Sequence, residues 1–315
     1  MRKEKQKMVI GVSTRALFDL SVENEIYETR GVEAYCRYQA EHEKDILKPG
    51  PGFRLIKALL GLNEYGKKEK LVEVIVMSRN SPGASLRVFR SIEAYGLPIL
   101  RAVLASGSSL APYLSAFKTD LFLSAHEDDV QSAVDNGIAA GIVCTENDSS
   151  HDSSPFQDCG EKADQIRIAF DGDAVLFTDQ SERIFKEKGL HAFSENERLN
   201  AQKPLEAGPF AGFLKKLSSI KEDLGQENCP IRTALVTSRC APAHERVIRT
   251  LQAWGVKVDE AFFLGGLEKR EVLKAFGAQI FFDDQIIHTL SAARDVPAAR
   301  VPYPRASGMG DYFGK

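Results

Sequence analysis

The apolar residues of this chain gather in short runs, and two carboxylates interrupt the most informative of them. Residues 168–177 read Ile-Ala-Phe-Asp-Gly-Asp-Ala-Val-Leu-Phe, so that Asp171 and Asp173 stand two positions apart. The apolar residues before Asp171 predict a buried strand that ends in acidic side chains. Burying two like charges is costly unless a cation or a substrate compensates for them. The pattern therefore favours a divalent metal, although an Asp-Gly-Asp turn between two hairpin strands would also explain it.

Two further apolar runs are followed by residues whose hydroxyl or carboxylate groups can bind a substrate or a metal. One covers residues 234–236 and is followed by Thr237, and the other covers 278–282 and stops at Asp283 and Asp284. Lys269 lies between them, near the start of a helix-like segment. If the three runs are parallel strands, their carboxyl ends meet in one crevice, where open α/β sheets bind their ligands. The pattern thus predicts an α/β fold with a parallel sheet and a single site.

The order of these residues resembles the haloacid dehalogenase superfamily of aspartate-nucleophile phosphatases, whose motifs run Asp-x-Asp, Thr/Ser, Lys and an acidic pair. Residues 170–177, 236–246 and 280–285 look like one branch, the cytosolic 5'-nucleotidase type I family. Residues 13–19 and 78–80 also look like that family, so the resemblance covers nearly the whole chain. It implies a Rossmann-like, haloacid dehalogenase-type parallel sheet.

The resemblance also implies a role for each acidic residue of the motifs. Asp171 is the expected nucleophile, which forms an aspartyl-phosphate, and Asp173 is the expected general acid and base. Mg²⁺ is expected to bind the Asp171 carboxylate, the Asp173 backbone carbonyl and one or both of Asp283 and Asp284. Asp284 is the preferred direct ligand of the two.

Other residues of the motifs are expected to bind the phosphate. Thr237 is expected to donate a hydrogen bond to a phosphoryl oxygen, and Lys269 to neutralise charge on the phosphate and the nucleophile. Lys274 competes for that role, but Lys269 follows a Gly-Gly turn and so better suits the start of a helix. The remaining candidates for contact with the substrate are Gly172, Ser238, Arg239 and His244.

The motifs specify phosphomonoester chemistry but say little about the alcohol. The resemblance points to hydrolysis of nucleoside 5'-monophosphates, with AMP foremost, to nucleoside and phosphate. A phosphatase of sugar phosphates or other metabolites is the first alternative. A non-catalytic nucleotide-binding regulatory protein is the second.

The chain also resembles itself. Residues 87–96 are similar to 246–255, and 117–125 to 276–284, which indicates an internal duplication of one α/β unit. Ser13 and Arg15 stand opposite Asp171 and Asp173, and the first half lacks the acids and the lysine. We therefore expect catalytic motifs only in the C-terminal half, while Arg15 would suit either anion binding or an outward-facing position.

The duplication suggests where the domains begin and end. We predict a degenerate α/β repeat over 1–146, a polar linker over 147–164 and a catalytic domain over 165–315. Within the last, residues 178–230 leave room for a small cap or a flexible loop. Phe193, Phe210 and Phe213 are candidates there for stacking on a base, although aromatic residues at such positions are more often part of the core.

Composition excludes several classes of protein. A net charge of −3 argues against nucleic acid as the main partner, and no apolar run is long enough to span a membrane. Five scattered cysteines, without a Cys-x-x-Cys pair, are expected to be reduced thiols. We expect a cytoplasmic enzyme that acts on a small molecule; its oligomeric state stays open, with a homo-oligomer as one option.

Overall fold

A computed structural model of the chain describes residues 7–66, 70–144, 165–225, 229–307 and 309. The predicted linker over 147–164 lies outside these ranges. Strands and helices alternate along most of the chain. In the N-terminal half the elements are β1 (Met8–Val12), α1 (Thr14–Leu17), α2 (Ser21–Glu41), α3 (Phe53–Gly61), η1 (Leu62–Glu64), β2 (Val72–Ser78), η2 (Gly83–Ser85), α4 (Leu86–Ala94), β3 (Arg101–Leu104), α5 (Ala111–Ala116), β4 (Leu121–Ser124), α6 (Glu127–Asp135) and β5 (Ala139–Val143). In the C-terminal half they are β6 (Ile166–Phe170), η5 (Gly172–Leu176), α7 (Gln180–Leu199), α8 (Ala211–Leu224), β7 (Ile231–Thr237), α9 (His244–Ala253), β8 (Glu260–Phe263), α10 (Arg270–Phe276), β9 (Ile280–Asp283), α11 (Ile286–Ala292), β10 (Ala298–Arg300) and η6 (Arg305–Ser307).

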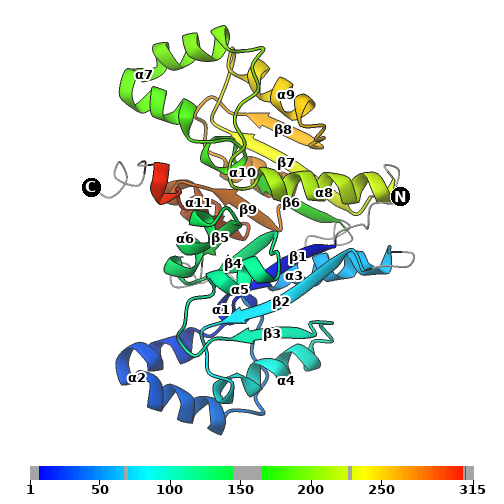
Figure 1. The fold of residues 1–315 in the computed structure, drawn as a ribbon, viewed down its shortest axis with the longest axis vertical. Helices are drawn as coiled ribbons and strands as arrows, with labels where there is room; N and C mark the ends of the chain where they lie inside the picture. The colour runs from blue at the N-terminus through cyan, green and yellow to red at the C-terminus, as the bar shows by residue number, and fades with distance from the viewer. Residues whose placement is uncertain (1–6, 67–69, 145–164, 226–228, 308, 310–315) are drawn as a thin grey trace.

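In the described part of the chain, ten strands form one sheet in the order β3-β2-β1-β4-β5-β10-β9-β6-β7-β8 (Figure 1). Neighbouring strands are parallel except β5 and β10, which pair antiparallel where the two halves meet. The prediction of an α/β protein with a mostly parallel sheet is confirmed. The halves also share one strand order, because β8-β7-β6-β9-β10 follows the same pattern as β3-β2-β1-β4-β5.

Helices cover both faces of the sheet, which explains why its strands consist mainly of apolar residues. On β1, Met8, Ile10 and Val12 belong to one core cluster, whereas Val9 faces the other side of the sheet. Helices α3, α4, α8 and α9 contribute to the first face. Helices α5 and α6 cover the second face in the N-terminal half, and α10 and α11 cover it in the C-terminal half. The sheet is thus the middle layer of three.

A long helix follows the first strand of each half. Helices α2 and α7 lie at opposite ends of the molecule (Figure 1), and each changes direction at a glycine with a positive φ, Gly31 at 81° and Gly189 at 78°. Only glycine adopts this conformation without strain. Helices α7 and α8 account for most of the segment 178–230, which is therefore helical. Among the described helices, none combines the length and the apolar character that crossing a membrane requires.

The hairpin alternative for the Asp-Gly-Asp segment is wrong. Strand β6 pairs in parallel with β7 and β9. After Asp171 the chain enters the short helical turn η5, in which Ala174 has a φ of 61°. Asp171 therefore stands at the carboxyl end of a central strand.

Candidate active site

The carboxyl ends of β6 and β9 bring three acidic side chains together. Asp171 follows β6, Asp283 ends β9, and Asp284 comes next in the chain. One carboxylate oxygen from each lies within 4.8 Å of the other two, and all three residues are buried. Thr237 ends the neighbouring strand β7 and is also buried. The register of the parallel strands is what places these four residues at one edge of the sheet.

Lys269 neutralises part of the charge of this cluster. It lies at the N-terminal end of α10, and its Nζ donates to Asp171 Oδ1 at 2.7 Å and to Asp283 Oδ2 at 2.6 Å. Burial alone would lower the pKa of Lys269, but the two carboxylates raise it above its usual value. Lys274 is largely exposed and pairs with Asp295 at 3.1 Å. Of the two lysines considered, Lys269 is the one at the cluster.

The three carboxyls experience different environments. Burial raises the pKa of Asp171 to about 7, against the opposing effect of Lys269. Burial would also raise the pKa of Asp283, yet it is lowered, because Lys269 and His288 both stabilise the carboxylate. Asp283 Oδ1 accepts a hydrogen bond from the Gln285 backbone N at 2.8 Å. Asp283 is therefore fixed as an anion at the end of β9.

Asp284 has one oxygen that is available to a ligand. Its Oδ2 forms a short hydrogen bond with the Tyr303 hydroxyl, whose oxygen also lies 2.9 Å from Glu182 Oε2. Its Oδ1 is buried and has no hydrogen-bond partner. Burial, reinforced by the neighbouring Asp283 and Glu182, raises the pKa of Asp284 well above its usual value. An unsatisfied buried oxygen beside two other carboxylates fits an oxygen-seeking divalent cation.

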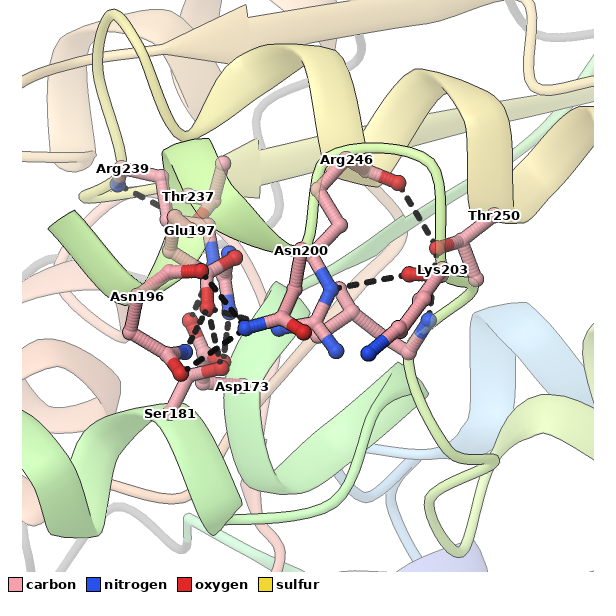
Figure 2. Close-up of polar contacts among 11 residues, drawn as sticks. Asp173, Ser181, Asn196, Glu197, Asn200, Lys203, Thr237, Arg239, Arg246 and Thr250 are labelled. Carbon is pink, nitrogen blue, oxygen red and sulfur yellow. Dashed lines mark hydrogen bonds and ion pairs between the residues drawn. The ribbon is translucent and has the colours of Figure 1, made fainter. Parts of the chain in front are cut away.

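Asp173 takes part in a separate ion-pair network, shown in Figure 2. Arg239 donates from Nε to Asp173 Oδ2 at 2.7 Å and from Nη2 to Asp173 Oδ1 at 2.6 Å. The remaining nitrogen, Nη1, donates to Glu197 Oε2 at 2.5 Å, and Arg246 Nη1 donates to Glu197 Oε1 at 2.9 Å. Ser181 Oγ donates to the same Oε1 at 2.9 Å. The network thus joins η5, the loop after β7, and helices α7 and α9.

Glu197 is the centre of this network, and no pattern in the sequence points to it. It is fully buried on α7, and its two oxygens together accept hydrogen bonds from two arginines. The Arg239 guanidinium also lies over the Phe193 ring, 5.3 Å from its centroid. Two cations beside one buried carboxylate need the further carboxylate of Asp173 to balance their charge. Arg239, which is predicted to contact the substrate, contacts Asp173 and Glu197 in this structure.

The other predicted residues lie around the cluster at different depths. Gly172 is buried beside Thr237, since a Cβ added to it would stand 3.2 Å from Thr237 Oγ1. Thr237 Oγ1 accepts a hydrogen bond from the Arg239 backbone N at 3.3 Å. Ser238 is exposed. His244 begins α9 with its ring against Phe263 and its buried Nδ1 without a partner.

Two of the aromatic candidates belong to the core. Phe210 and Phe213 are buried, and both rings lie 6.2 Å from Phe170 between centroids. Stacking on a base from these positions is excluded by their burial. Cys36, Cys229 and Cys240 are free thiols, as expected, and Cys159 lies outside the described ranges.

A family model and a curated relative of this chain agree with each other. A family model described as 5'-nucleotidase matches residues 1–308. Cytosolic 5'-nucleotidase 1B from Homo sapiens is 39% identical over 302 residues, which cover 93% of this chain and 48% of that protein. The chain thus spans about half the length of this curated relative. A solved structure described as a UDP-N-acetylglucosamine 2-epimerase from Listeria monocytogenes aligns with 93% of this chain and 78% of that chain, at 8% identity and a TM-score of 0.23, too weak a likeness to inform the fold.

Proposed function

Because the chain belongs to the 5'-nucleotidase family, we propose that it hydrolyses nucleoside 5'-monophosphates, AMP foremost, to nucleoside and inorganic phosphate. The observation that carries this proposal is the buried contact of Lys269 with both Asp171 and Asp283. A carboxylate held beside a lysine at the end of a parallel strand suits nucleophilic attack on a phosphate, because the cation compensates for the charge of both groups.

The reaction takes place in two displacements. The Asp171 carboxylate attacks phosphorus and the bond from phosphorus to the ribose O5' breaks. The departing oxygen takes a proton from Asp173, which enters this step protonated and therefore with one of its two hydrogen bonds from Arg239 broken. Asp173 then accepts a proton from water as the water attacks the aspartyl-phosphate. Phosphate leaves, and Asp171 is regenerated. Arg239 positions the Asp173 carboxyl through its two hydrogen bonds.

We propose Mg²⁺ as the cofactor. Its ligands are the Asp171 carboxylate, the Asp173 backbone carbonyl and Asp284, with Asp283 as a second acidic residue nearby. The unpartnered Oδ1 of Asp284 supports Asp284 as the direct ligand, because both oxygens of Asp283 already have partners. Bound Mg²⁺ supplies charge neutralisation for the phosphoryl group and the carboxylates. Thr237 donates from its hydroxyl to a phosphoryl oxygen, and Lys269 neutralises a second one.

We further infer a haloacid dehalogenase-like fold that arose by duplication. The shared strand order of the halves and the paired glycine bends at Gly31 and Gly189 support this inference. On this view residues 1–146 are a degenerate repeat and 165–315 the catalytic unit, joined into one sheet by β5 and β10. The relative named as cytosolic supports a cytoplasmic location.

The test is phosphate release from a panel of nucleoside monophosphates and sugar phosphates, with and without Mg²⁺, using Asp171→Asn as the blank. We expect Mg²⁺-dependent release from AMP or a related nucleotide that falls by about 10³-fold or more in Asp171→Asn. Phosphate release from sugar phosphates alone would be consistent with the proposed mechanism but would reject nucleoside monophosphates as the substrate. Equal rates in Asp171→Asn and the unaltered chain would reject the assigned nucleophile.

A further inference from the structure

The N-terminal half contains a pocket at the carboxyl ends of β1, β2 and β4. Its volume is about 450 Å³, within the range of small-molecule sites. Helix α2 supplies one wall through residues that include Tyr27 and Tyr35. By strand order, this pocket takes the place in the first half that the carboxylate cluster takes in the second.

The ends of these strands carry hydroxyls in place of the acids. Ser13 follows β1 as Asp171 follows β6, and Ser124 ends β4 as Asp283 ends β9. Ser124 and Asp283 accept the same backbone hydrogen bond, although the residue type differs. The His126 backbone N donates to Ser124 Oγ at 3.0 Å, as the Gln285 backbone N donates to Asp283 Oδ1 at 2.8 Å. Strand ends without carboxylates provide donors for an anion and no ligand set for a divalent cation.

The third strand shows the same relationship. Ser78 ends β2 as Thr237 ends β7. The Asn80 backbone N donates to Ser78 Oγ at 3.1 Å, matching the bond from the Arg239 backbone N to Thr237 Oγ1 at 3.3 Å. The hydroxyl that is expected to bind phosphate in the second half therefore has a counterpart in the pocket.

The charges of the pocket also favour an anion. Its two described carboxylates are each paired with an arginine: Asp129 accepts from Arg79 at 2.8 Å, and Glu23 forms a buried ion pair with Arg87. Arg15 adds a further guanidinium to the lining. Since both acids are compensated, the lining does not repel a phosphate group, a group to which arginine donates strong hydrogen bonds.

Two tyrosines on α2 supply an aromatic wall. The Tyr27 and Tyr35 rings lie 6.0 Å apart between centroids and nearly perpendicular, at 85°. The Tyr35 hydroxyl is fixed by hydrogen bonds from Gln39 Nε2 at 3.1 Å and Asn80 Nδ2 at 2.9 Å. Tyr27 is half exposed, so a face of its ring is accessible. A fixed edge-to-face pair presents a surface on which a planar group can stack.

We propose that this pocket is a second, non-hydrolytic binding site for a nucleoside phosphate. Ser13, Ser78 and Arg15 bind the phosphate without a metal, and Tyr27 stacks on the base. The inference does not depend on hydrolysis at the other half, because it uses residues that the proposed reaction does not use.

The probe is AMP, and its binding to full-length Asp171→Asn is measured by equilibrium dialysis in the presence of a chelator. We expect a class of sites that Arg15→Glu weakens by about tenfold or more, the effect of losing one charged contact. Tyr27→Ala should weaken the same class, and its half-exposed position makes a folding defect unimportant. Arg101→Ala is the matched control, since Arg101 is an exposed arginine of the same half that does not line the pocket.

Unchanged AMP binding in both Arg15→Glu and Tyr27→Ala would overturn the inference. A single class of sites that survives both substitutions would do the same. Arg15-dependent binding in a protein that releases no phosphate from any nucleotide would reject the proposed function and leave the second site in place. The two proposals therefore fail separately.

Discussion

Arg239 binds Asp173 through two parallel hydrogen bonds of 2.7 and 2.6 Å. The same guanidinium donates to Glu197 on α7, so that a helix outside the sheet determines where the Asp173 carboxyl lies (Figure 2). Arg239 is almost completely buried, and its ion pairs with Asp173 and Glu197 raise its pKa further despite its burial. Arg239 therefore fixes the position of the Asp173 carboxyl, the proposed acid and base, in addition to supplying a positive charge.

Arg239→Lys separates these two effects. Lysine keeps the positive charge but cannot donate two parallel hydrogen bonds to one carboxylate and a third to another. We expect kcat for AMP hydrolysis to fall by on the order of tenfold to a hundredfold, with a smaller change in KM. Arg249→Lys is the control, because Arg249 is exposed and pairs only within its own helix in the described contacts, with Glu245. A wild-type kcat in Arg239→Lys would mean that the bidentate contact has no role in turnover.

Lys269→Ala should destabilise the metal-free protein. Removal of the ammonium leaves Asp171 and Asp283, two buried carboxylates, without their shared cation. We expect a loss of about 3 kcal/mol in the free energy of unfolding, measured with urea in the presence of a chelator. Lys274→Ala, on the exposed side of the same helix, should change stability by no more than about 0.5 kcal/mol. Equal effects of the two substitutions would contradict the assignment of Lys269 to the cluster.

The strands and the acidic cluster are predictable from the sequence for the same physical reason. Strands covered on both faces need mostly apolar residues, so β6, β7 and β9 each contain an apolar run, at 168–170, 234–236 and 280–282. A carboxylate at the end of such a run is conspicuous, and parallel pairing then brings the ends together. The pattern of apolar runs is therefore sufficient to place Asp171, Thr237 and Asp283 near one another.

Glu197 and Tyr303 could not be found in this way. Glu197 lies on α7, where charged residues are frequent, and only tertiary contacts with Arg239 and Arg246 show that it is the buried one. Tyr303 reaches Asp284 and Glu182 from a segment beyond β10. The antiparallel pairing of β5 with β10 could not be predicted either. Each is the edge strand of its own half, and the sequence of a short apolar edge strand does not determine which strand pairs with it.

Gly208 and Gly212 provide a matched pair for stability. A Cβ on Gly208 would lie 2.3 Å from the Phe177 carbonyl oxygen, a backbone atom that cannot move away without disturbing η5. We expect Gly208→Ala to lower the free energy of unfolding by about 3 kcal/mol. Gly212 lies on α8 with nothing within 4 Å of an added Cβ, so Gly212→Ala should raise it by up to about 1 kcal/mol. Chemical denaturation of both variants checks the signs.

Mg²⁺ should stabilise the protein more strongly at pH 8 than at pH 5.5. Burial raises the pKa of Asp171 to about 7 and that of Asp284 well above its usual value. Without metal, the folded state therefore binds protons that the unfolded chain has released. The contribution of these groups to stability falls as pH rises from about 4 to about 7. Mg²⁺ replaces those protons on the carboxylates, so the stabilisation by Mg²⁺ increases as pH rises over the same range.

Thermal unfolding at matched ionic strength measures this coupling. At a free Mg²⁺ concentration about 100-fold above its Kd, we expect a gain of about 2.7 kcal/mol at pH 8 and a clearly smaller gain at pH 5.5, where protons compete for the carboxylates. Asp284→Asn should remove most of the gain at pH 8, because the unpartnered Oδ1 is the oxygen that the cation needs. Since Asn is neutral, this variant should also be more stable than the unaltered chain when metal is absent. An identical Mg²⁺ effect at both pH values, or in both proteins, would place the cation elsewhere.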